Sequence, residues 1–143
     1  MNKTSIAVVF VGGVFAAALT VTVGAQATRS SNEGVYTAEQ ATKGEAVYKE
    51  QCAACHGDNL EGSGPMPPLA GKDFLANWQG KTIGDLFEKT QTSMPATAPG
   101  TLTPEQTAQV MAYVLSVSKY PAGSAALPDK MDALKTITID TPK

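Results

Sequence analysis

Five consecutive residues, Cys52-Ala53-Ala54-Cys55-His56, contain both cysteines and the only histidine of this 143-residue chain. The C-x-x-C-H pattern is typical of covalent haem attachment, in which two thiols bond to the vinyl groups at one edge of the porphyrin. If Cys52 ends a helix, both sulfurs can face that edge while the adjacent His56 reaches the iron from one side. The motif therefore predicts a chain that folds around one covalently bound haem c, with Cys52 and Cys55 as attachments and His56 as an axial ligand.

Three other roles of a cysteine pair explain less of the motif. A disulfide between Cys52 and Cys55 would close a very short loop, gain little chain entropy and leave His56 without a role. A structural zinc site needs four ligands, usually from two separated pairs, and the chain has two cysteines and one histidine. A thioredoxin-like dithiol belongs to a βαβ unit, for which the sequence shows no strands.

A haem that only transfers electrons needs a sixth ligand, and methionine is the available type because the chain has no second histidine. Beyond the N-terminal segment the methionines are Met66, Met94, Met111 and Met131. Met111 lies on the apolar face of an expected helix, and Met131 lies near the C-terminus. Met66 follows His56 by only ten residues, too few for an easy crossing to the opposite haem face. Met94 follows by 38 residues and is favoured as the second axial ligand.

Residues 1–27 have the form of an export signal. Lys3 is followed by an apolar run over 6–23, and Ala25-Gln26-Ala27 supplies the small residues of a cleavage site. We expect cleavage before Thr28 and export into a bacterial periplasm. The apolar run is near the lower limit for spanning a bilayer, so membrane attachment is expected only if residues 6–23 are retained as an anchor.

Charge and aromatic content narrow the class of protein. Residues 1–27 contain one lysine and no acidic residue, so the remainder has 10 basic and 13 acidic side chains and a formal charge of −3. A nucleic-acid-binding domain would normally carry a basic stripe, and none is expected here. Only 6% of the residues are aromatic, so a large apolar cofactor would supply core volume that side chains do not.

Capping residues and apolar spacing predict three helices. The first begins at Thr37 and runs to about Cys52, a short second helix follows Thr82, and the last begins at Thr103-Pro104 and ends at Tyr120-Pro121. Glycines and prolines predict loops over 57–71 and 94–100.

The ends of the chain give weaker signals. Residues 136–139 alternate like a strand but have no obvious partner. We therefore expect an all-α chain with a linker over 28–36, a haem domain over 37–122 and a tail over 123–143.

Several further motifs occur in the order found in one known family. The chain resembles class I c-type cytochromes from about Gly44 to Gly123, and most resembles the haem domains attached to or serving quinoprotein alcohol dehydrogenases. The shared residues are Gly44-x-x-x-Tyr48, Cys52-Ala-Ala-Cys55-His56-Gly57, Pro67-Pro68-Leu69-Ala70-Gly71, Phe74 with Trp78, Met94-Pro95, Pro99-Gly100-x-Leu102 and Ala112-Tyr113-Val114-Leu115.

The resemblance implies a class I cytochrome c fold, with three to five helices packed around one covalently bound haem. It also implies that Gly44 and Tyr48 cross the last helix near Tyr113, where glycine permits close approach of the two backbones.

The resemblance further implies a set of residues that support the haem pocket. The carbonyl of Pro67 is expected to accept a hydrogen bond from the second ring nitrogen of His56. The indole of Trp78 is expected to donate to a haem propionate, with simple core filling as the alternative. Tyr48 and Leu69 complete this set.

These features predict an exported electron carrier with a single haem and no enzymatic activity of its own. Its partners would be redox proteins: a periplasmic dehydrogenase, such as a quinoprotein, as donor, and a terminal oxidase or another cytochrome as acceptor. A tightly bound cytochrome subunit of a dehydrogenase complex is one alternative. A five-coordinate haem enzyme is another, but it needs a distal histidine or arginine, and Arg29 is the only arginine.

Overall fold

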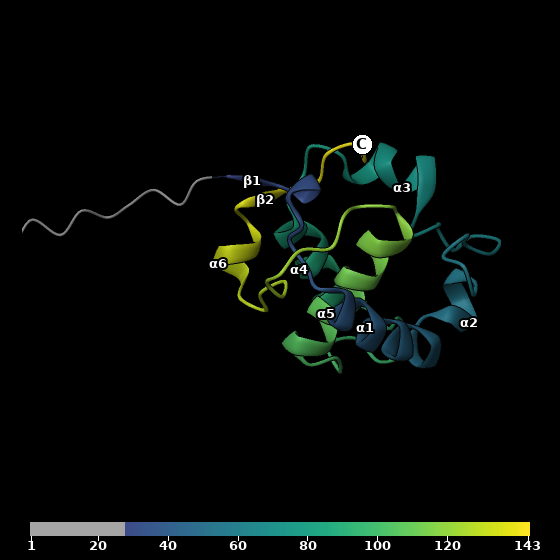
Figure 1. The fold of residues 1–143 in the computed structure, drawn as a ribbon. Coiled ribbons are helices and arrows are strands. Elements are labelled where there is room, and N and C mark those ends of the chain that lie inside the picture. The colour runs from purple at the N-terminus through teal and green to yellow at the C-terminus, as the bar shows by residue number, and fades with distance from the viewer. Residues whose placement is uncertain (1–27) are drawn as a thin grey trace, which may run out of the picture.

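The computed structural model describes residues 28–143, which fold into six α-helices, one 3-10 turn and two short strands (Figure 1). The expected export signal at 1–27 lies outside the described residues. In chain order the elements are β1 (Arg29–Ser30), η1 (Ser31–Glu33), α1 (Ala38–Gln51), α2 (Ala53–His56), α3 (Gly71–Trp78), α4 (Ile83–Ser93), α5 (Pro104–Val117), α6 (Met131–Leu134) and β2 (Ile137–Thr138).

The predicted all-α fold is confirmed, and the three predicted helices are α1, α4 and α5. Thr37, Thr82 and Thr103 are their N-caps, and each hydroxyl accepts a hydrogen bond from a backbone N–H in the first turn. Six helices are present in 28–143 instead of three to five because α2 and α6 are single turns of four residues.

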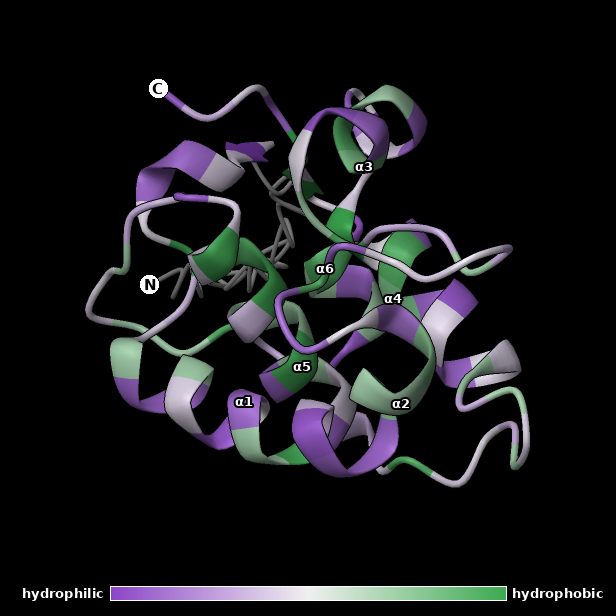
Figure 2. Ribbon diagram, turned by 90° about the vertical axis from the view of Figure 1, so that its right-hand side faces the viewer, coloured by the Kyte–Doolittle hydropathy of each residue, from purple (hydrophilic) through white to green (hydrophobic). Residues whose placement is uncertain are grey.

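Helices α1 and α5 cross at Gly44, as expected. A Cβ placed on Gly44 would lie 1.8 Å from the carbonyl oxygen of Gln109 in α5, so only glycine fits this contact. One turn later the rings of Tyr48 and Tyr113 pack with their centroids 5.3 Å apart. Hydrophobic stretches of α4 and α5 lie in the interior, whereas α1 carries hydrophilic residues along its outer side (Figure 2).

One helix and one helix boundary differ from the prediction. Helix α3 was not predicted because its N-cap, Ala70, offers no side-chain oxygen, although Phe74 is buried and packs near Trp78. Helix α5 ends at Val117, three residues before Tyr120. Lys119 adopts a left-handed backbone with φ of 70°, and the Tyr120 N–H bonds to the Leu115 carbonyl at 3.0 Å.

Residues 29–30, at the start of the described part, pair with residues 137–138 near the C-terminus, which the sequence did not suggest. β1 and β2 form a parallel pair with Arg29 opposite Ile137 and Ser30 opposite Thr138 (Figure 1). The expected linker over 28–36 and the expected tail over 123–143 therefore pack on the helical body. Their buried residues belong to the same core as the helices: Val35, Tyr36, Leu127, Leu134, Ile137 and Ile139.

Within residues 28–143, no helix combines the length and the apolar character that a membrane span requires.

Candidate haem-binding site

The C-x-x-C-H motif lies at a bend between two helices. α1 ends at Gln51, Cys52 leaves helical geometry with φ of −127°, and the single turn of α2 follows at once. The His56 N–H donates to the Cys52 carbonyl at 2.9 Å, which closes the motif into a compact turn. Cys52 is half-buried, Cys55 is exposed and His56 is only 6% exposed.

The imidazole of His56 is held by the loop that follows. Its Nδ1 donates to the Pro67 carbonyl at 2.8 Å, the bond expected from the resemblance, and the Gly62 N–H donates to the His56 carbonyl at 2.8 Å. Of the two neutral tautomers of imidazole, a hydrogen bond from Nδ1 to a carbonyl selects the one that has its lone pair on Nε2. Nε2 makes no hydrogen bond to residues 28–143, which is the state that an iron ligand requires.

Tyr48 connects this loop to α1. The side chain is fully buried, and its hydroxyl donates to the Gly57 carbonyl at 2.7 Å, one residue beyond His56. Burial raises the pKa of Tyr48, so the phenol stays protonated and able to donate. On the far side of the loop, the Leu69 N–H donates to the Leu60 carbonyl at 2.8 Å. The loop is thereby held at both ends.

The two thiols suit covalent attachment better than redox or zinc chemistry. Neither thiol is in a disulfide. Burial, and to a smaller extent the charge of the nearby Cys55, raises the pKa of Cys52 to about 11. A redox dithiol needs a lowered thiol pKa, which is the opposite of the shift at Cys52. Residues 28–143 hold no group of three or more histidine, cysteine or acidic side chains able to bind a metal ion, and their only strands are the two-residue β1 and β2.

The methionines differ in their surroundings. Met111 is 3% exposed in the core, as predicted, and Met131 of the expected tail packs against that core. Met66 is 37% exposed in a turn closed by backbone hydrogen bonds with Ser63. Met94 is half-buried at the C-cap of α4, where a Pro-containing loop begins.

Trp78 and Leu69 are both half-buried against the core. The ring of Trp78 packs near Phe74 with centroids 6.4 Å apart, and the Lys81 ammonium lies 4.9 Å from its centroid. The indole N–H makes no hydrogen bond to residues 28–143, so it remains available to a bound acceptor. The residues present therefore fit a haem: two free thiols, an oriented histidine with a free nitrogen, and half-buried apolar side chains.

An acidic surface adjoins the motif. Residues 45–61 contain four acidic side chains and one basic side chain, so the whole formal charge of −3 of residues 28–143 lies in this segment. A shallow hollow of 460 Å³ beside it is lined by Ala53, Ala54, Asp58 and Glu61 among others.

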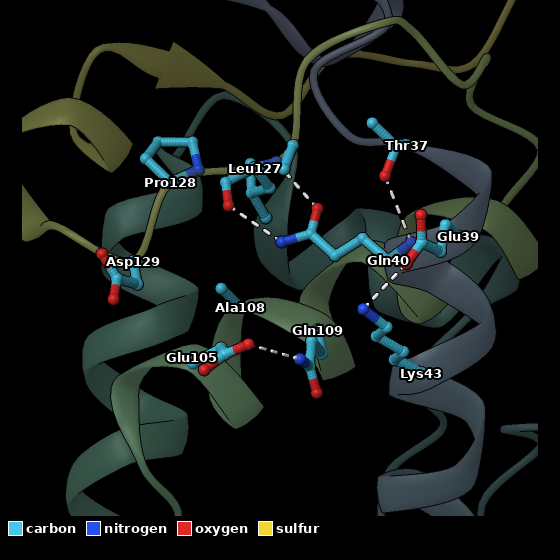
Figure 3. Close-up of a pocket in the computed structure, with 11 residues that line it drawn as sticks. Thr37, Glu39, Gln40, Lys43, Glu105, Ala108, Gln109, Leu127, Pro128 and Asp129 are labelled. Atoms are coloured by element: carbon cyan, nitrogen blue, oxygen red, sulfur yellow. Dashed lines mark hydrogen bonds and ion pairs between the residues drawn. The ribbon is translucent and has the colours of Figure 1, made fainter.

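A second hollow, of 360 Å³, lies between α1, α5 and the chain near Leu127 (Figure 3). Its polar groups are already paired. The Gln40 amide bonds to both the N–H and the carbonyl of Leu127, at 2.7 and 2.9 Å, and Lys43 pairs with Glu39 at 2.8 Å. This hollow lies where residues 126–129 pack against α1 and α5, and no cysteine, histidine or methionine lines it.

Sequence reasoning missed the polar contacts that hold the loops around the motif. The hydroxyl of Tyr48, the N–H of Gly62 and the amide of Gln91 all bond to backbone groups of loops. No sequence pattern marks such bonds, because their partners are carbonyls or N–H groups that every residue carries.

The match to a known family covers more than half of the chain. Residues 39–114 match the family described as cytochrome C oxidase, cbb3-type, subunit III. This span contains the motif, Pro67, Trp78 and Met94.

Individual relatives are of several kinds. The chain is 33% identical over 84 residues to the cbb3-type cytochrome c oxidase subunit CcoP of Rubrivivax gelatinosus, covering 58% of this chain and 28% of that protein. It is 37% identical over 81 residues to a thiosulfate dehydrogenase of Stutzerimonas stutzeri, covering 52% and 26%. The chain thus spans about a quarter of the length of these two relatives. It is 28% identical over 99 residues to a cytochrome c of Nigella damascena, covering 54% and 89%.

A solved structure has the same fold. The sulfane dehydrogenase SoxCD from Paracoccus pantotrophus aligns with a TM-score of 0.50 and 23% identity, over 78% of this chain and 59% of that chain. At this identity the likeness concerns the fold alone. Together with the family match, the helical fold and the motif show that this chain belongs to the family described as cytochrome C oxidase, cbb3-type, subunit III, and is a cytochrome c domain.

Proposed function

We propose that the protein is an exported carrier of single electrons with one haem c, attached through Cys52 and Cys55 and ligated by His56 and Met94. The observation that carries the proposal is the arrangement at His56, where Nδ1 is bonded to Pro67 and Nε2 is free beside two unpaired thiols. When bound, haem would supply an iron that changes its charge by one unit.

The residues of the chain have three tasks in this function. Pro67 orients the imidazole of His56 and Gly62 holds its backbone, so that the ring is positioned before any ligand binds. Half-buried apolar side chains such as Leu69 exclude water from the haem. The small side chains Ala53 and Ala54 leave the attachment edge accessible to a partner.

The donor would be a periplasmic dehydrogenase, such as a quinoprotein, and the acceptor a terminal oxidase or another cytochrome. In this role the chain is not itself an enzyme. The division into an export signal at 1–27 and a cytochrome domain beginning after it belongs to the same proposal, with a membrane anchor only if residues 6–23 are retained.

A second candidate is a tightly bound cytochrome subunit of a dehydrogenase or oxidase complex. It is favoured by the relatives in which the matched region is 26% to 28% of a larger redox protein. Purification of the native protein distinguishes the two, because a subunit would elute with other proteins in fixed proportion and a carrier would elute alone.

The axial ligand provides the direct test of a carrier. The ferric protein should show the weak red absorption band of sulfur–iron coordination. Met94→Ala should abolish this band, and Met66→Ala, the matched control, should retain it. The reduced wild type should bind carbon monoxide poorly and turn over no peroxide. Rapid carbon monoxide binding with peroxide turnover would replace the carrier by a five-coordinate haem enzyme.

A further inference from the structure

Loop 94–102 joins α4 to α5 and carries Met94 at its first position. Both ends of the loop are bonded to consecutive residues of α4. The Met94 N–H donates to the Thr90 carbonyl at 2.9 Å, and the Leu102 carbonyl accepts from the side-chain amide of Gln91 at 2.5 Å. The last turn of α4 thus holds the two ends of the loop close together.

The other half of the Gln91 amide reaches α5. Its Oε1 accepts from the hydroxyl of Thr107 at 3.0 Å, and Thr107 is fully buried. The same hydroxyl lies 3.0 Å from the Thr103 carbonyl, so its single hydrogen is shared between two acceptors. One side chain therefore connects α4, the end of the loop and the first turns of α5.

Gln91 differs from its neighbours at the end of α4. The hydroxyls of Thr90, Thr92 and Ser93 all bond to carbonyls one turn back in the same helix. The backbone of the loop also lies near Gln91 at Gly100, where an added Cβ would be 3.8 Å from the Gln91 carbonyl oxygen. Leu102, whose carbonyl Gln91 holds, is 5% exposed.

We propose that Gln91 is a positioning residue for Met94, which holds loop 94–102 closed and so keeps the thioether in place as the sixth ligand. This inference rests on the proposed function, because it assigns Met94 to the iron.

When loop 94–102 is already closed, Met94 loses little conformational entropy on binding the iron. Without the two bonds of Gln91, the end of the loop at Leu102 is released and its open form becomes more populated. An external ligand that competes with Met94 binds only the open form, so its apparent affinity rises with that population. Loss of the hydrogen bonds of one side chain should increase the affinity by about tenfold.

The experiment measures imidazole binding to the ferric holoprotein, together with the red sulfur–iron band. Gln91→Leu replaces the amide by an apolar side chain that forms neither hydrogen bond and offers no ligand to iron, and it should bind imidazole about tenfold more tightly. Thr92→Ala, one residue away with an exposed side chain, is the matched control and should bind as the wild type does. If Gln91→Leu does not fold, Thr107→Val removes one of the two bonds and should give a smaller increase.

Comparing the wild type with Met94→Ala distinguishes a wrong positioning role for Gln91 from a wrong ligand assignment for Met94. In Met94→Ala, imidazole should bind tightly, and adding Gln91→Leu should change nothing further because no thioether bond remains to be released. If Met94→Ala binds more tightly than the wild type while Gln91→Leu does not, the positioning role is wrong and the ligand assignment stands. If Met94→Ala leaves binding unchanged, both are overturned.

Discussion

Gly44 shows how one residue decides the contact between the two longest helices. The absent side chain lets the backbones of α1 and α5 meet at the Gln109 carbonyl. Tyr48, one turn later, then reaches both Tyr113 and the carbonyl that follows His56. The helix crossing and the support of the loop that follows His56 therefore depend on the same stripe of α1.

Gly44→Ala should strongly destabilise the protein, although alanine is the better helix former. The added methyl would lie 1.8 Å from the Gln109 oxygen, and overpacking against backbone should cost about 3 kcal/mol. Denaturant unfolding of the holoprotein measures this. Ala46→Ser adds one atom to the exposed side of α1 and should shift stability by less than about 0.5 kcal/mol. Equal effects of the two changes would contradict the close crossing.

At the scale of elements, the N-terminus of α4 is held by a reciprocal pair of side chains. The Asp85 carboxylate accepts from the Thr82 N–H and hydroxyl, both at 2.8 Å, and the Asp85 N–H donates to the Thr82 hydroxyl at 3.1 Å. These bonds, with a smaller contribution from Lys135 and Lys81, hold the pKa of Asp85 below its usual 3.8. Folding therefore favours the ionised carboxylate.

The stability gained from Asp85 should depend on pH in one direction. It is fully present above the pKa of the unfolded chain and is lost as the pH falls through the lower pKa of the folded state. Asp85→Ala should cost about 1 kcal/mol at pH 7 and clearly less near pH 2. Thermal unfolding at both pH values tests this. Glu88→Ala, exposed on the same helix, should show no such difference, and a pH-independent loss for Asp85→Ala would refute the assignment.

At the scale of the whole molecule, the segments 28–36 and 120–143 form one structure. Besides the β1–β2 pair, the Asp140 side chain bonds to the Ser30 hydroxyl, and the Tyr36 hydroxyl donates to the Tyr120 carbonyl at 2.7 Å. The Ile139 N–H and carbonyl bond to Lys81 and Gly80, just before α4. The C-terminal segment thus joins the N-terminal segment to the helical body.

Ile139→Ala tests whether this segment contributes to the fold. Ile139 is fully buried, so the truncation should cost about 2–4 kcal/mol. Lys143→Ala, four residues further and exposed, should be neutral. Unfolding by denaturant measures both, and an unchanged midpoint for Ile139→Ala would mean that residues 123–143 are a dispensable tail.

Charge at the attachment edge should govern which oxidants react fastest. With the formal charge of −3 concentrated in residues 45–61, added salt should slow oxidation by the cation tris(1,10-phenanthroline)cobalt(III) and accelerate oxidation by the anion ferricyanide.

Asp58→Lys should slow oxidation by the cation by roughly two- to threefold. Glu88→Lys makes the same charge change on α4 and should have less effect. Stopped-flow rates at two ionic strengths measure these changes. If both variants respond alike, electrons do not leave beside Ala54.

The motif by itself predicted haem binding, and the family match supports that cofactor class. Cys52, Cys55 and His56 are the only cysteines and histidine of the chain. Their spacing suits two thioether bonds at one edge of a haem with an adjacent iron ligand. Local rules also predicted α1, α4 and α5, because caps and apolar periodicity act within a few residues.

Tertiary structure decided what depends on residues far apart in sequence. Helix α3 lacks a capping side chain and depends on packing by Phe74. The strand at 137–138 acquires its partner more than a hundred residues earlier. The bond of Gln91 to Leu102 needs two helices in place first. Contacts of this kind join ordinary backbone groups, so nothing in the local sequence distinguishes the residues that make them.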